Sequence, residues 1–352
     1  MTSRDVAFRV LELVEKGGFA SDLLRHESEN LSPRDAGLAE TIVMGSLRHQ
    51  AQLDYLIEHY SGRKQKLDAE VRIALRMGIY QLRYLDRIPA HAAVTESVEL
   101  VKRARKRSAA PLVNAILRKV DRAPVAWPDL ATELSIPQWM LQRWQRQYGD
   151  GAAEQIARAA LEQPGVWVNQ ETRREQDIGA QSIVPLLAIE PGMTVLDLCA
   201  APGNKTAQAI AAGARVFACD VSMSRLASVP GSRVLLDATL ELPFTAKFDR
   251  ILIDAPCSGT GTLSRNPEIK WRLKPGDLVR FQTTQRQMLA QALKFLKPEG
   301  RLVYSTCSLE EEENEDVIEG RSAEIHHRLP GRDPGDGFFA GVIAWKESYS
   351  EF

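Results

Sequence analysis

Two cysteine residues stand where they could carry out covalent chemistry. Cys257 lies in the sequence DAPCSG at 254–259, and Cys307 lies in YSTCS at 304–308. Each follows a short apolar run rich in β-forming residues, at 248–253 and at 301–304. Open parallel sheets bind ligands at the carboxyl ends of their strands, so two such strands would bring both thiols to one edge. Because thiolates are strong nucleophiles, this pair indicates covalent catalysis followed by assisted release. The alternative is that both are small core residues, since unpaired cysteine is among the most buried residue types.

A turn of small residues follows the first predicted strand. Its sequence, CAAPGNKT at 199–206, opens a helix and would let a ligand approach the backbone amides closely. Three later strands end in carboxylates, at Asp220, Asp237 and Asp254, and these would face one crevice. Asp220 lies 17 residues after Gly203, near the spacing of about 20 at which nucleotide-binding folds hold a ribose. We therefore expect Asp220 to accept from ribose hydroxyls and Asp237 from an adenine amino group. The spacing of a P-loop is absent, which disfavours phosphate binding.

Composition narrows the class of protein. The 352 residues predict two domains, and 44% hydrophobic content suffices for packed cores. No apolar run approaches the roughly 18 residues that span a bilayer, so we expect a cytoplasmic protein without membrane contact. The four cysteines all lie in the second half and show no metal-ligand spacing, which disfavours disulfides and a metal site. The near balance of 45 basic and 46 acidic side chains leaves nucleic-acid binding open.

The N-terminal third has the pattern of an all-α bundle. Apolar residues recur at helical spacing from Arg4 to about Val120, for example at 7, 10, 11 and 14. Ser32 and Pro33 predict a helix start, and Pro89 and Pro111 predict helix breaks. A basic run, the Lys102–Arg107 cluster, follows one of these helices; it is either a solvated helix face or a phosphate-binding surface. Its members are Lys102, Arg103, Arg105, Lys106 and Arg107.

The second half has the pattern of an α/β domain. After a Pro- and Trp-containing linker at 123–137 and a short helix at 139–148, strand-like runs alternate with helical ones beyond residue 176. This alternation predicts a parallel sheet covered by helices on both faces. The strands are expected at 195–198, 216–219, 234–236, 250–253 and 302–304. We read the acidic run at 310–313 as the start of a helix with a favourable dipole.

These motifs together resemble a known family. The turn at 199–206, the sequence DAPCSGTG at 254–261, IKW at 269–271 and STCS at 305–308 are similar to the S-adenosylmethionine-dependent RNA cytosine-5 methyltransferases. Residues 4–120 resemble the NusB-like RNA-binding domain, and the combination is typical of the bacterial 16S rRNA methyltransferase B subfamily. The resemblance implies a NusB-like helical domain at 1–125, a linker and small subdomain at 126–176, and a Rossmann-like class I methyltransferase domain at 177–352.

The resemblance also implies a mechanism and the residues that carry it. Cys307 would add to carbon 6 of cytosine, making carbon 5 nucleophilic toward the methyl group of S-adenosylmethionine, and Cys257 would assist release of the product. Asp254 would hydrogen-bond the cytosine edge, and Lys205 would lower a thiol pKa or hold phosphate; a turn cap for Asp254 and a solvated side chain for Lys205 are the alternatives. The residues expected to hold the methyl donor are Cys199, Ala200, Ala201, Pro202, Gly203, Asn204, Lys205, Asp220, Arg225, Asp237 and Asp254.

The expected partner is 16S rRNA or a small-subunit assembly intermediate, bound by a monomer. A base within paired RNA must be flipped out before a thiol reaches carbon 6. Arg173, Arg174 and the Lys102–Arg107 cluster are candidates for phosphate contacts, and Lys270 and Trp271 for the substrate groove, although Trp271 could equally be packing. An RNA-binding antitermination or assembly factor with an inactive methyltransferase half, and a tRNA methyltransferase, are the rival functions.

The chain departs from the family pattern in two ways. Asn204 replaces a common second glycine, and we expect the turn to survive because Asn tolerates positive φ. The segments at 170–176, 225–233 and 319–325 look shorter than in relatives, which bears on substrate contacts there.

Overall fold

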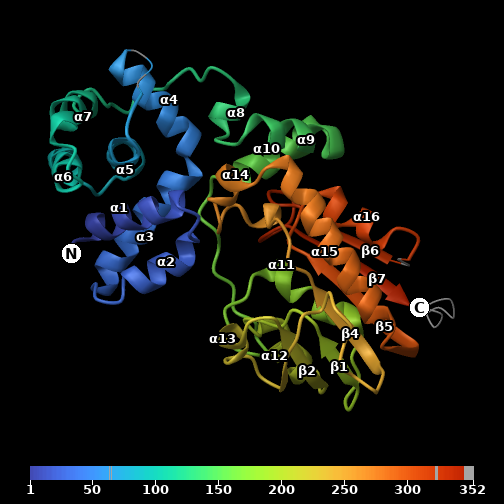
Figure 1. The fold of residues 1–352 in the computed structure, drawn as a ribbon. Coiled ribbons are helices and arrows are strands. Elements are labelled where there is room, and N and C mark those ends of the chain that lie inside the picture. The colour runs from blue at the N-terminus through green and yellow to red at the C-terminus, as the bar shows by residue number, and fades with distance from the viewer. Residues whose placement is uncertain (63, 65, 322–323, 345–352) are drawn as a thin grey trace. The chain divides into compact units, whose positions relative to one another are not determined.

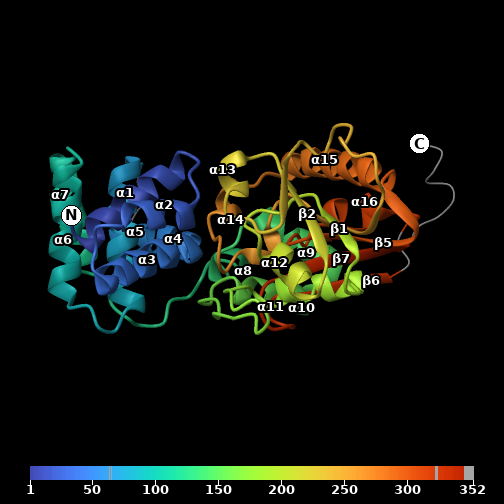
Figure 2. The same cartoon turned by 90° about the horizontal axis from the view of Figure 1, so that it is seen from below.

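The structure is a computed structural model that describes residues 1–62, 64, 66–321 and 324–344. The chain divides into two compact units (Figures 1 and 2). The helical unit contains residues 1–163 and 263–272, and the sheet unit contains residues 164–262 and 273–352. The range 177–352, predicted as one catalytic domain, therefore includes a ten-residue segment that the structure groups with the helices.

The helical unit is built on amphipathic helices whose apolar faces form one core. Its first seven helices are α1 (Ser3–Glu15), α2 (Ala20–Glu27), α3 (Pro33–Arg48), α4 (Gln50–Ser61), α5 (Ala69–Tyr84), α6 (Ala90–Arg103) and α7 (Ala110–Leu117), with a 3₁₀ turn η1 (Arg107–Ala109). Three further helices are α8 (Leu130–Glu133), α9 (Gln138–Tyr148) and α10 (Asp150–Ala159), and the late segment contributes α14 (Ile269–Arg272). The all-α prediction for this part of the chain is confirmed.

Local sequence signals set where these helices begin. The hydroxyl of Ser32 accepts from the backbone N–H of Asp35, and Pro33 occupies the first turn of α3, as predicted. Pro89 and Pro111 both lie at helix starts rather than at helix ends. In the middle of α3, Gly45 lies against the ring of Tyr80 so closely that a Cβ atom would fall 1.9 Å from Cζ. Glycine is therefore required for the close packing of α3 on α5.

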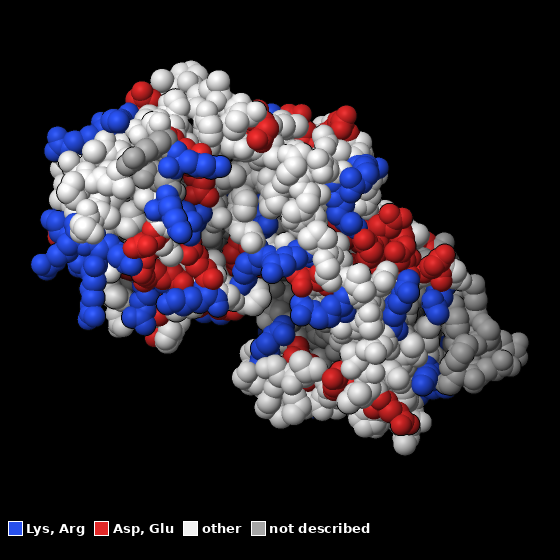
Figure 3. All heavy atoms as spheres, turned by 45° about the horizontal axis from the view of Figure 1, so that its top comes forward, with Lys and Arg blue, Asp and Glu red and all other residues white. Residues whose placement is uncertain are grey.

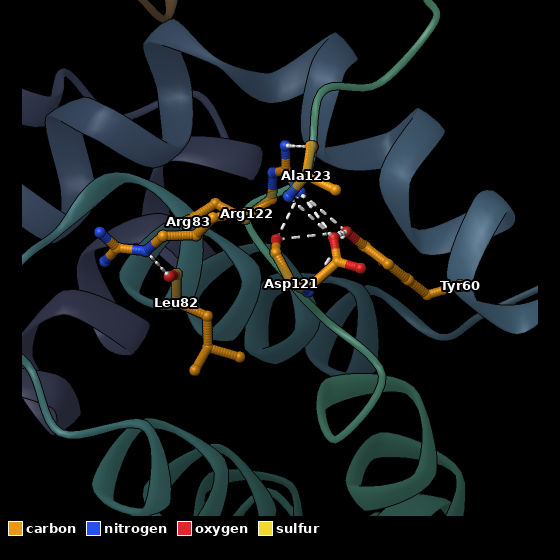
Figure 4. Close-up of polar contacts among 6 residues, drawn as sticks. All are labelled: Tyr60, Leu82, Arg83, Asp121, Arg122 and Ala123. Atoms are coloured by element: carbon orange, nitrogen blue, oxygen red, sulfur yellow. Dashed lines mark hydrogen bonds and ion pairs between the residues drawn. The ribbon is translucent and has the colours of Figure 1, made fainter.

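The segment that leaves α7 is held against the bundle by arginine side chains (Figure 4). Arg83, in the last turn of α5, donates to the hydroxyl of Tyr60 at 2.8 Å, to the carbonyl of Asp121, and to that of Ala123 at 2.9 Å. Arg122 donates in return to the carbonyl of Leu82 at 2.9 Å. These contacts fix the first residues of the predicted linker.

The late segment 263–272 is fixed to the helical unit by polar contacts that the sequence did not indicate. The carboxylate of Glu268 accepts from the backbone N–H of Ala20 at 3.0 Å, and Arg272 donates to the carbonyl of Gly17 at 2.6 Å. Lys270 is 1% exposed and makes two more such bonds, which are described below. The segment therefore belongs to the helical unit, although it follows the Cys257 loop in sequence.

The sheet unit contains seven strands in the order β3-β2-β1-β4-β5-β7-β6. The first five pair in parallel, and β7 runs antiparallel to both β5 and β6. Their bounds are β1 (Thr194–Asp197), β2 (Arg215–Asp220), β3 (Ser232–Leu235), β4 (Phe248–Asp254), β5 (Leu296–Thr306), β6 (Glu324–Arg328) and β7 (Phe338–Ala344). All five predicted strands are present, and the antiparallel pair β6 and β7 was missed.

Alternate residues of the central strands face two separate cores. Leu196, Ile251 and Leu302 pack with α15 (Pro275–Leu293), whereas Val195 and Leu252 pack with α12 (Asn204–Ala211) and the 3₁₀ turn η2 (Val184–Leu187). The remaining short elements are α11 (Ile178–Gln181), α13 (Met223–Leu226), η3 (Thr260–Thr262), η4 (Glu311–Glu313) and α16 (Glu315–Ile318). Burial of both faces explains why these strands read as continuous apolar runs.

The connection between β2 and β3 carries only the four-residue helix α13, in the region expected to be short. Part of a second such region, at 322–323, lies outside the described residues. Among the residues that are described, no helix has both the length and the hydropathy of a membrane span. Within the same residues, no group of three or more His, Cys, Asp or Glu side chains is placed to hold a metal ion.

Candidate active site

The two predicted thiols lie together at one edge of the sheet. Asp254, the last residue of β4, is paired with Ser305 of the neighbouring parallel strand β5, so the residues that follow both strands emerge side by side. The Sγ atoms of Cys257 and Cys307 are 3.3 Å apart. This separation is short enough for a thiol of one cysteine to donate a hydrogen bond to the sulfur of the other.

The surroundings distinguish these thiols from the other two in the chain. A hydrogen bond with Cys307, together with burial, raises the pKa of Cys257 well above its usual value. Cys257 therefore keeps its proton and is available as the donor in the pair. Burial also raises the pKa of Cys199 well above its usual value and that of Cys219 to about 12. Among the described residues, neither the sulfur of Cys199 nor that of Cys219 lies against a second sulfur as those of Cys257 and Cys307 do. Cys219 packs in the core.

A carboxylate and an ammonium group form an ion pair beside the thiols. Lys205 Nζ lies 2.7 Å from Asp254 Oδ2, and the Lys205 side chain is 12% exposed. The hydroxyl of Ser305 donates to Asp254 Oδ1 at 3.0 Å. Lys205 and Ser305 therefore hold the carboxylate of Asp254. The alternative role, a cap on the turn that follows β4, is not the one that the structure shows. The alternative of a solvated Lys205 is wrong, and its ammonium group pairs with Asp254 rather than with a thiol.

The small-residue turn has the conformation that a close approach to the backbone requires. Gly203 has φ +100° and caps the start of α12. A Cβ atom at Gly203 would lie 3.0 Å from Cδ of Pro230, so a larger residue would be both strained and crowded. Asn204 is the first residue of α12 rather than a residue of positive φ, and its side chain donates to the carbonyl of Glu175. The explanation offered for Asn204 from the sequence was therefore wrong, although the turn is intact.

The carboxylates at the ends of β2 and β3 both contact backbone amides. Asp220 is 5% exposed and accepts from Ala201 N at 3.3 Å and Ser222 N at 2.9 Å. Arg225 donates to the carbonyl of Ala201 at 3.1 Å, which braces the same turn. The exposed Asp237 accepts from its neighbour Thr239, and these hydrogen bonds lower the Asp237 pKa. Both carboxylates retain lone pairs for a ligand at this edge.

A further buried carboxylate lies at the end of β1 and was missed by sequence reasoning. Asp197 is 1% exposed and accepts from the hydroxyl of Thr206 at 2.7 Å through Oδ2. Among the described residues its Oδ1 atom has no hydrogen-bond partner. Burial raises the pKa of Asp197 to about 7. The signal in the sequence that could have found Asp197 is its position, since it ends the first strand just as Asp220 ends the second.

Comparison with known proteins identifies the family. The family model described as 16S rRNA methyltransferase RsmB/F matches residues 184–327, and that of the NusB family matches residues 1–122. The ribosomal RNA small subunit methyltransferase B of Cronobacter sakazakii is 31% identical over 97% of this chain and 98% of its own length. That of Bacillus subtilis, described as probable, is 30% identical over 90% of this chain and 87% of its own length. The chain belongs to the ribosomal RNA small subunit methyltransferase B family.

Solved structures agree on the fold of this methyltransferase. The crystal structure of PH0851 has a TM-score of 0.77 at 19% identity and covers 97% of this chain and 99% of that one. A methyltransferase homolog protein from Pyrococcus horikoshii has a TM-score of 0.51 at 23% identity and covers 63% of this chain. The predicted combination of a NusB-like helical region and a methyltransferase sheet domain is confirmed.

The Lys102–Arg107 cluster of the methyltransferase is partly neutralised by its own helices. Lys102 pairs with Glu99 at 2.7 Å, Arg103 with Asp5 at 3.1 Å, and Lys106 with Asp68 at 2.8 Å. Arg105 and Arg107 are exposed, and no ion pair of either is found within the described part of the chain. Figure 3 shows that Lys and Arg side chains are interspersed with Asp and Glu side chains over one face of the molecule. Arg105 and Arg107 are thus the best-placed members for phosphate contacts.

The other RNA candidates of the methyltransferase differ in exposure. Arg173 is exposed, with φ +58°, in a turn between the bridged residues Val168 and Glu175, and Arg174 follows it half-buried. Lys270 donates to the carbonyls of Arg48 at 2.7 Å and Ser135 at 2.8 Å.

The prediction that Lys270 lines a substrate groove is wrong, because its ammonium group is enclosed and hydrogen-bonded within the helical unit. Trp271 donates to the carbonyl of Leu47 at 2.9 Å, as its packing alternative implied.

The end of the methyltransferase's acidic run at 310–313 also differs from expectation. Residues 311–313 form a 3₁₀ turn, and Glu313 is buried instead of solvated at a helix start. Its neighbour Asn314 is 1% exposed. Both side chains hydrogen-bond to the loops that carry the thiols, which sequence reasoning missed because an acidic run is usually a solvated surface.

Proposed function

We propose that the protein methylates carbon 5 of a cytosine in 16S rRNA through a covalent bond between Cys307 and the base, with S-adenosylmethionine as methyl donor. The single observation that carries the proposal is the 3.3 Å separation of the Cys257 and Cys307 sulfurs. Asp254 ends the strand beside them and is held by Lys205 and Ser305. A methyltransferase that acts on an already nucleophilic atom would have no use for this thiol pair.

The residues of the sheet edge fit the proposed methyl donor. Asp220 and Asp237 offer acceptors for hydroxyl and amino groups, and Gly203 keeps the turn that follows β1 open to a ligand. When bound there, S-adenosylmethionine supplies an electrophilic methyl group on a sulfonium ion. Arg225 and Ala201 support this turn through their hydrogen bond.

Cys307 provides the electrons that carbon 5 lacks. As a thiolate it adds to carbon 6 of the cytosine, a C–S bond forms, and the electron pair of the ring double bond becomes available at carbon 5. Asp254, held by Ser305 and paired with Lys205, would accept a hydrogen bond from the amino group of the base and so hold the ring in place for the addition. The electron pair at carbon 5 then forms a bond to the methyl carbon while the sulfonium–methyl bond breaks and leaves a neutral thioether, so that carbon 5 carries both the methyl group and its original proton.

Cys257 assists the return of the ring to its aromatic state. The carbon 5 proton passes to solvent, the C–S bond breaks, and its electron pair returns to Cys307 as a thiolate. Because the pKa of Cys257 is raised, it remains a thiol and donates a hydrogen bond to the leaving sulfur. Without this donor the departing thiolate is less stable, so the covalent intermediate should persist.

The proposed substrate places the protein in the cytoplasm, acting as a monomer on 16S rRNA or on a small-subunit assembly intermediate. The target cytosine must be unpaired or flipped out to reach Cys307. The helical unit, which matches the NusB family, is proposed to hold the RNA around it.

Two cysteine variants test the mechanism. We expect Cys307→Ala to lose methyl transfer by roughly 10⁴-fold or more, as removal of a nucleophile does, while binding of S-adenosylmethionine is retained. Cys257→Ala should accumulate a covalent protein–RNA adduct, visible as a denaturant-resistant band. Cys219→Ala, a change in the core, is the matched control and should turn over normally.

Bisulfite sequencing of total RNA from cells with and without the gene distinguishes the rival functions. Loss of one methylated cytosine in 16S rRNA supports the proposal. Loss of a tRNA site indicates a tRNA methyltransferase, and no loss at all indicates an RNA-binding factor with an inactive sheet unit. Full activity of Cys307→Ala would exclude the covalent mechanism.

A further inference from the structure

We infer that Glu313 is a positioning residue that holds the Cys257 loop and the Cys307 loop at their working separation; the inference rests on the proposed function. Glu313 is fully buried, and the hydrogen bonds described for its carboxylate come from Ser258, Gln285 and Ser308. It acts through the residues that follow the two cysteines, Ser258 and Ser308. The acidic run in which it lies is otherwise unused by the proposed mechanism.

One carboxylate oxygen of Glu313 fixes the Cys257 loop. Oε1 accepts from the backbone N–H of Ser258 at 2.8 Å and from the side-chain amide of Gln285 at 3.1 Å. The same amide donates to the carbonyl of Pro256 at 2.9 Å. The residues on both sides of Cys257 are therefore tied to one carboxylate, directly or through Gln285.

The other oxygen joins the two loops. Oε2 accepts from the hydroxyl of Ser258 and from the hydroxyl of Ser308 at 2.6 Å. The two hydroxyl oxygens are 3.0 Å from each other. Because these serines directly follow Cys257 and Cys307, the bond pattern sets the distance between the two loops.

The neighbouring residue Asn314 secures the Cys307 loop from both sides. Its Oδ1 atom accepts from the hydroxyl of Thr306 at 2.5 Å, and its Nδ2 atom donates to the carbonyl of Ser308 at 3.0 Å. The hydroxyl of Tyr304 donates to the backbone carbonyl of Glu313 at 2.6 Å, which anchors the turn on β5. Glu313 is thus held on a rigid support rather than on a free loop.

The chemistry of the four donors predicts which substitutions this position tolerates. The backbone N–H of Ser258 can only donate, so Oε1 must be replaced by an oxygen. The two serine hydroxyls that face Oε2 can rotate and accept instead. A glutamine at position 313 can therefore satisfy the site with its oxygen toward Ser258 N and its NH₂ group toward the hydroxyls. Alanine leaves all four donors without this acceptor.

Loss of this support should weaken catalysis without weakening RNA binding. A displacement of about 1 Å near a reacting group can cost roughly 100-fold in rate, and we expect a fall of that order in kcat for Glu313→Ala. The KM for RNA and the affinity for S-adenosylmethionine should stay close to those of the wild type. Glu313→Gln should restore most of the rate. Glu311→Ala, an exposed residue of the same 3₁₀ turn, is the matched control.

A second measurement reports on the thiols without any methyl transfer. Phenylarsine oxide forms a stable adduct when two adjacent thiols bind one arsenic atom. The affinity of the protein for this reagent therefore depends on the separation of Cys257 and Cys307. Loss of a residue that orients the ligands of a metal typically costs about 10- to 100-fold in metal affinity. By analogy we expect a loss in that range for Glu313→Ala and little loss for Glu313→Gln. Cys257→Ala should abolish the adduct, which would show that the measured binding comes from the pair of Cys257 and Cys307.

The two measurements separate this inference from the proposed function. If Glu313→Ala keeps both its kcat and its arsenical affinity, the positioning role is excluded. If Glu313→Gln is as impaired as Glu313→Ala, the charge matters rather than the position, and the inference is again wrong. If Cys307→Ala still methylates RNA while Glu313→Ala binds phenylarsine oxide weakly, the covalent mechanism fails and the positioning of the thiols stands.

Discussion

At the scale of single residues, the same side-chain type has different chemistry in different surroundings. Cys219 is enclosed among apolar residues, and burial keeps its pKa high. Cys257 also has a raised pKa, but for it the sulfur of Cys307 is the leading cause. A thiol held protonated next to a second sulfur is a hydrogen-bond donor, which is the role we propose for it in product release.

Asp197 gives a prediction for the pH dependence of stability. Burial raises its pKa from the usual 3.8 to about 7. Between these values the unfolded chain is ionised at this residue and the folded chain is not, so the unfolded state gains stability as pH rises. Without methyl donor, the free energy of unfolding should therefore fall with pH across this window, by up to about 1.4 kcal/mol per pH unit from this residue. Urea unfolding at a series of pH values measures it.

The variant Asp197→Asn should flatten that dependence, because an amide does not titrate. It keeps an oxygen to accept from Thr206. Glu241→Gln, a change at an exposed carboxylate, is the control and should leave the slope unchanged. If Asp197→Asn loses stability with pH as steeply as the wild type, Asp197 is already ionised in the folded protein.

At the scale of elements, the sequence predicted what local signals encode. The start of α3 follows from Ser32 and Pro33, and the ends of β4 and β5 follow from apolar runs that stop at polar residues. From those strand ends the meeting of Cys257 with Cys307 could be predicted. The strand β6 could not, because its exposed and polar residues carry no apolar alternation.

Contacts between distant parts of the sequence could not be predicted in this way. From its sequence, Lys270 is expected at the surface. In the structure its ammonium group instead donates to two backbone carbonyls that lie more than 130 positions away in the chain. Glu313 reads as part of a solvated acidic run, yet its partners come from three other segments. In both, the polar group is buried because several elements supply its hydrogen bonds together.

Lys270 gives a prediction for the stability of the helical unit. Lys270→Ala leaves the carbonyls of Arg48 and Ser135 buried without their donor, and each unsatisfied acceptor costs about 1–3 kcal/mol. We expect the free energy of urea unfolding, followed by circular dichroism, to fall by about 2 kcal/mol or more. Lys247→Ala, at an exposed position, should change it little. An unchanged transition would mean that the segment 263–272 does not contribute to the helical core.

At the scale of the whole molecule, relatives are longer than this chain. The alignment with the relative from Klebsiella pneumoniae strain 342 extends over 420 positions, although this chain has 352 residues. At least 68 aligned positions therefore have no counterpart in this chain. The connection between β2 and β3, which we expected from the sequence to be short, carries the four-residue helix α13. Loops vary in length at little cost when the elements they join are kept.

The distribution of charge gives the last prediction. With 45 basic and 46 acidic side chains, the molecule has no net attraction for RNA, so binding must depend on cations that are not already paired. Lys102 is paired with Glu99, whereas Arg105 and Arg107 are exposed. Each phosphate contact to single-stranded nucleic acid contributes about 0.7 to the slope of log K against log salt. The double variant Arg105→Gln, Arg107→Gln should therefore bind 16S rRNA fragments more weakly and lower this slope by about 1.4.

Lys102→Gln is the matched control for that measurement, because replacing an ion-paired lysine releases Glu99 and removes little free positive charge. Its salt slope should stay within about 0.3 of the wild type, less than half of one phosphate contact. Fluorescence anisotropy with a labelled RNA at several salt concentrations gives the slope for each variant. Should the double variant keep the wild-type slope while Arg173→Gln lowers it, the phosphate contacts lie on the sheet unit and not at the end of α6.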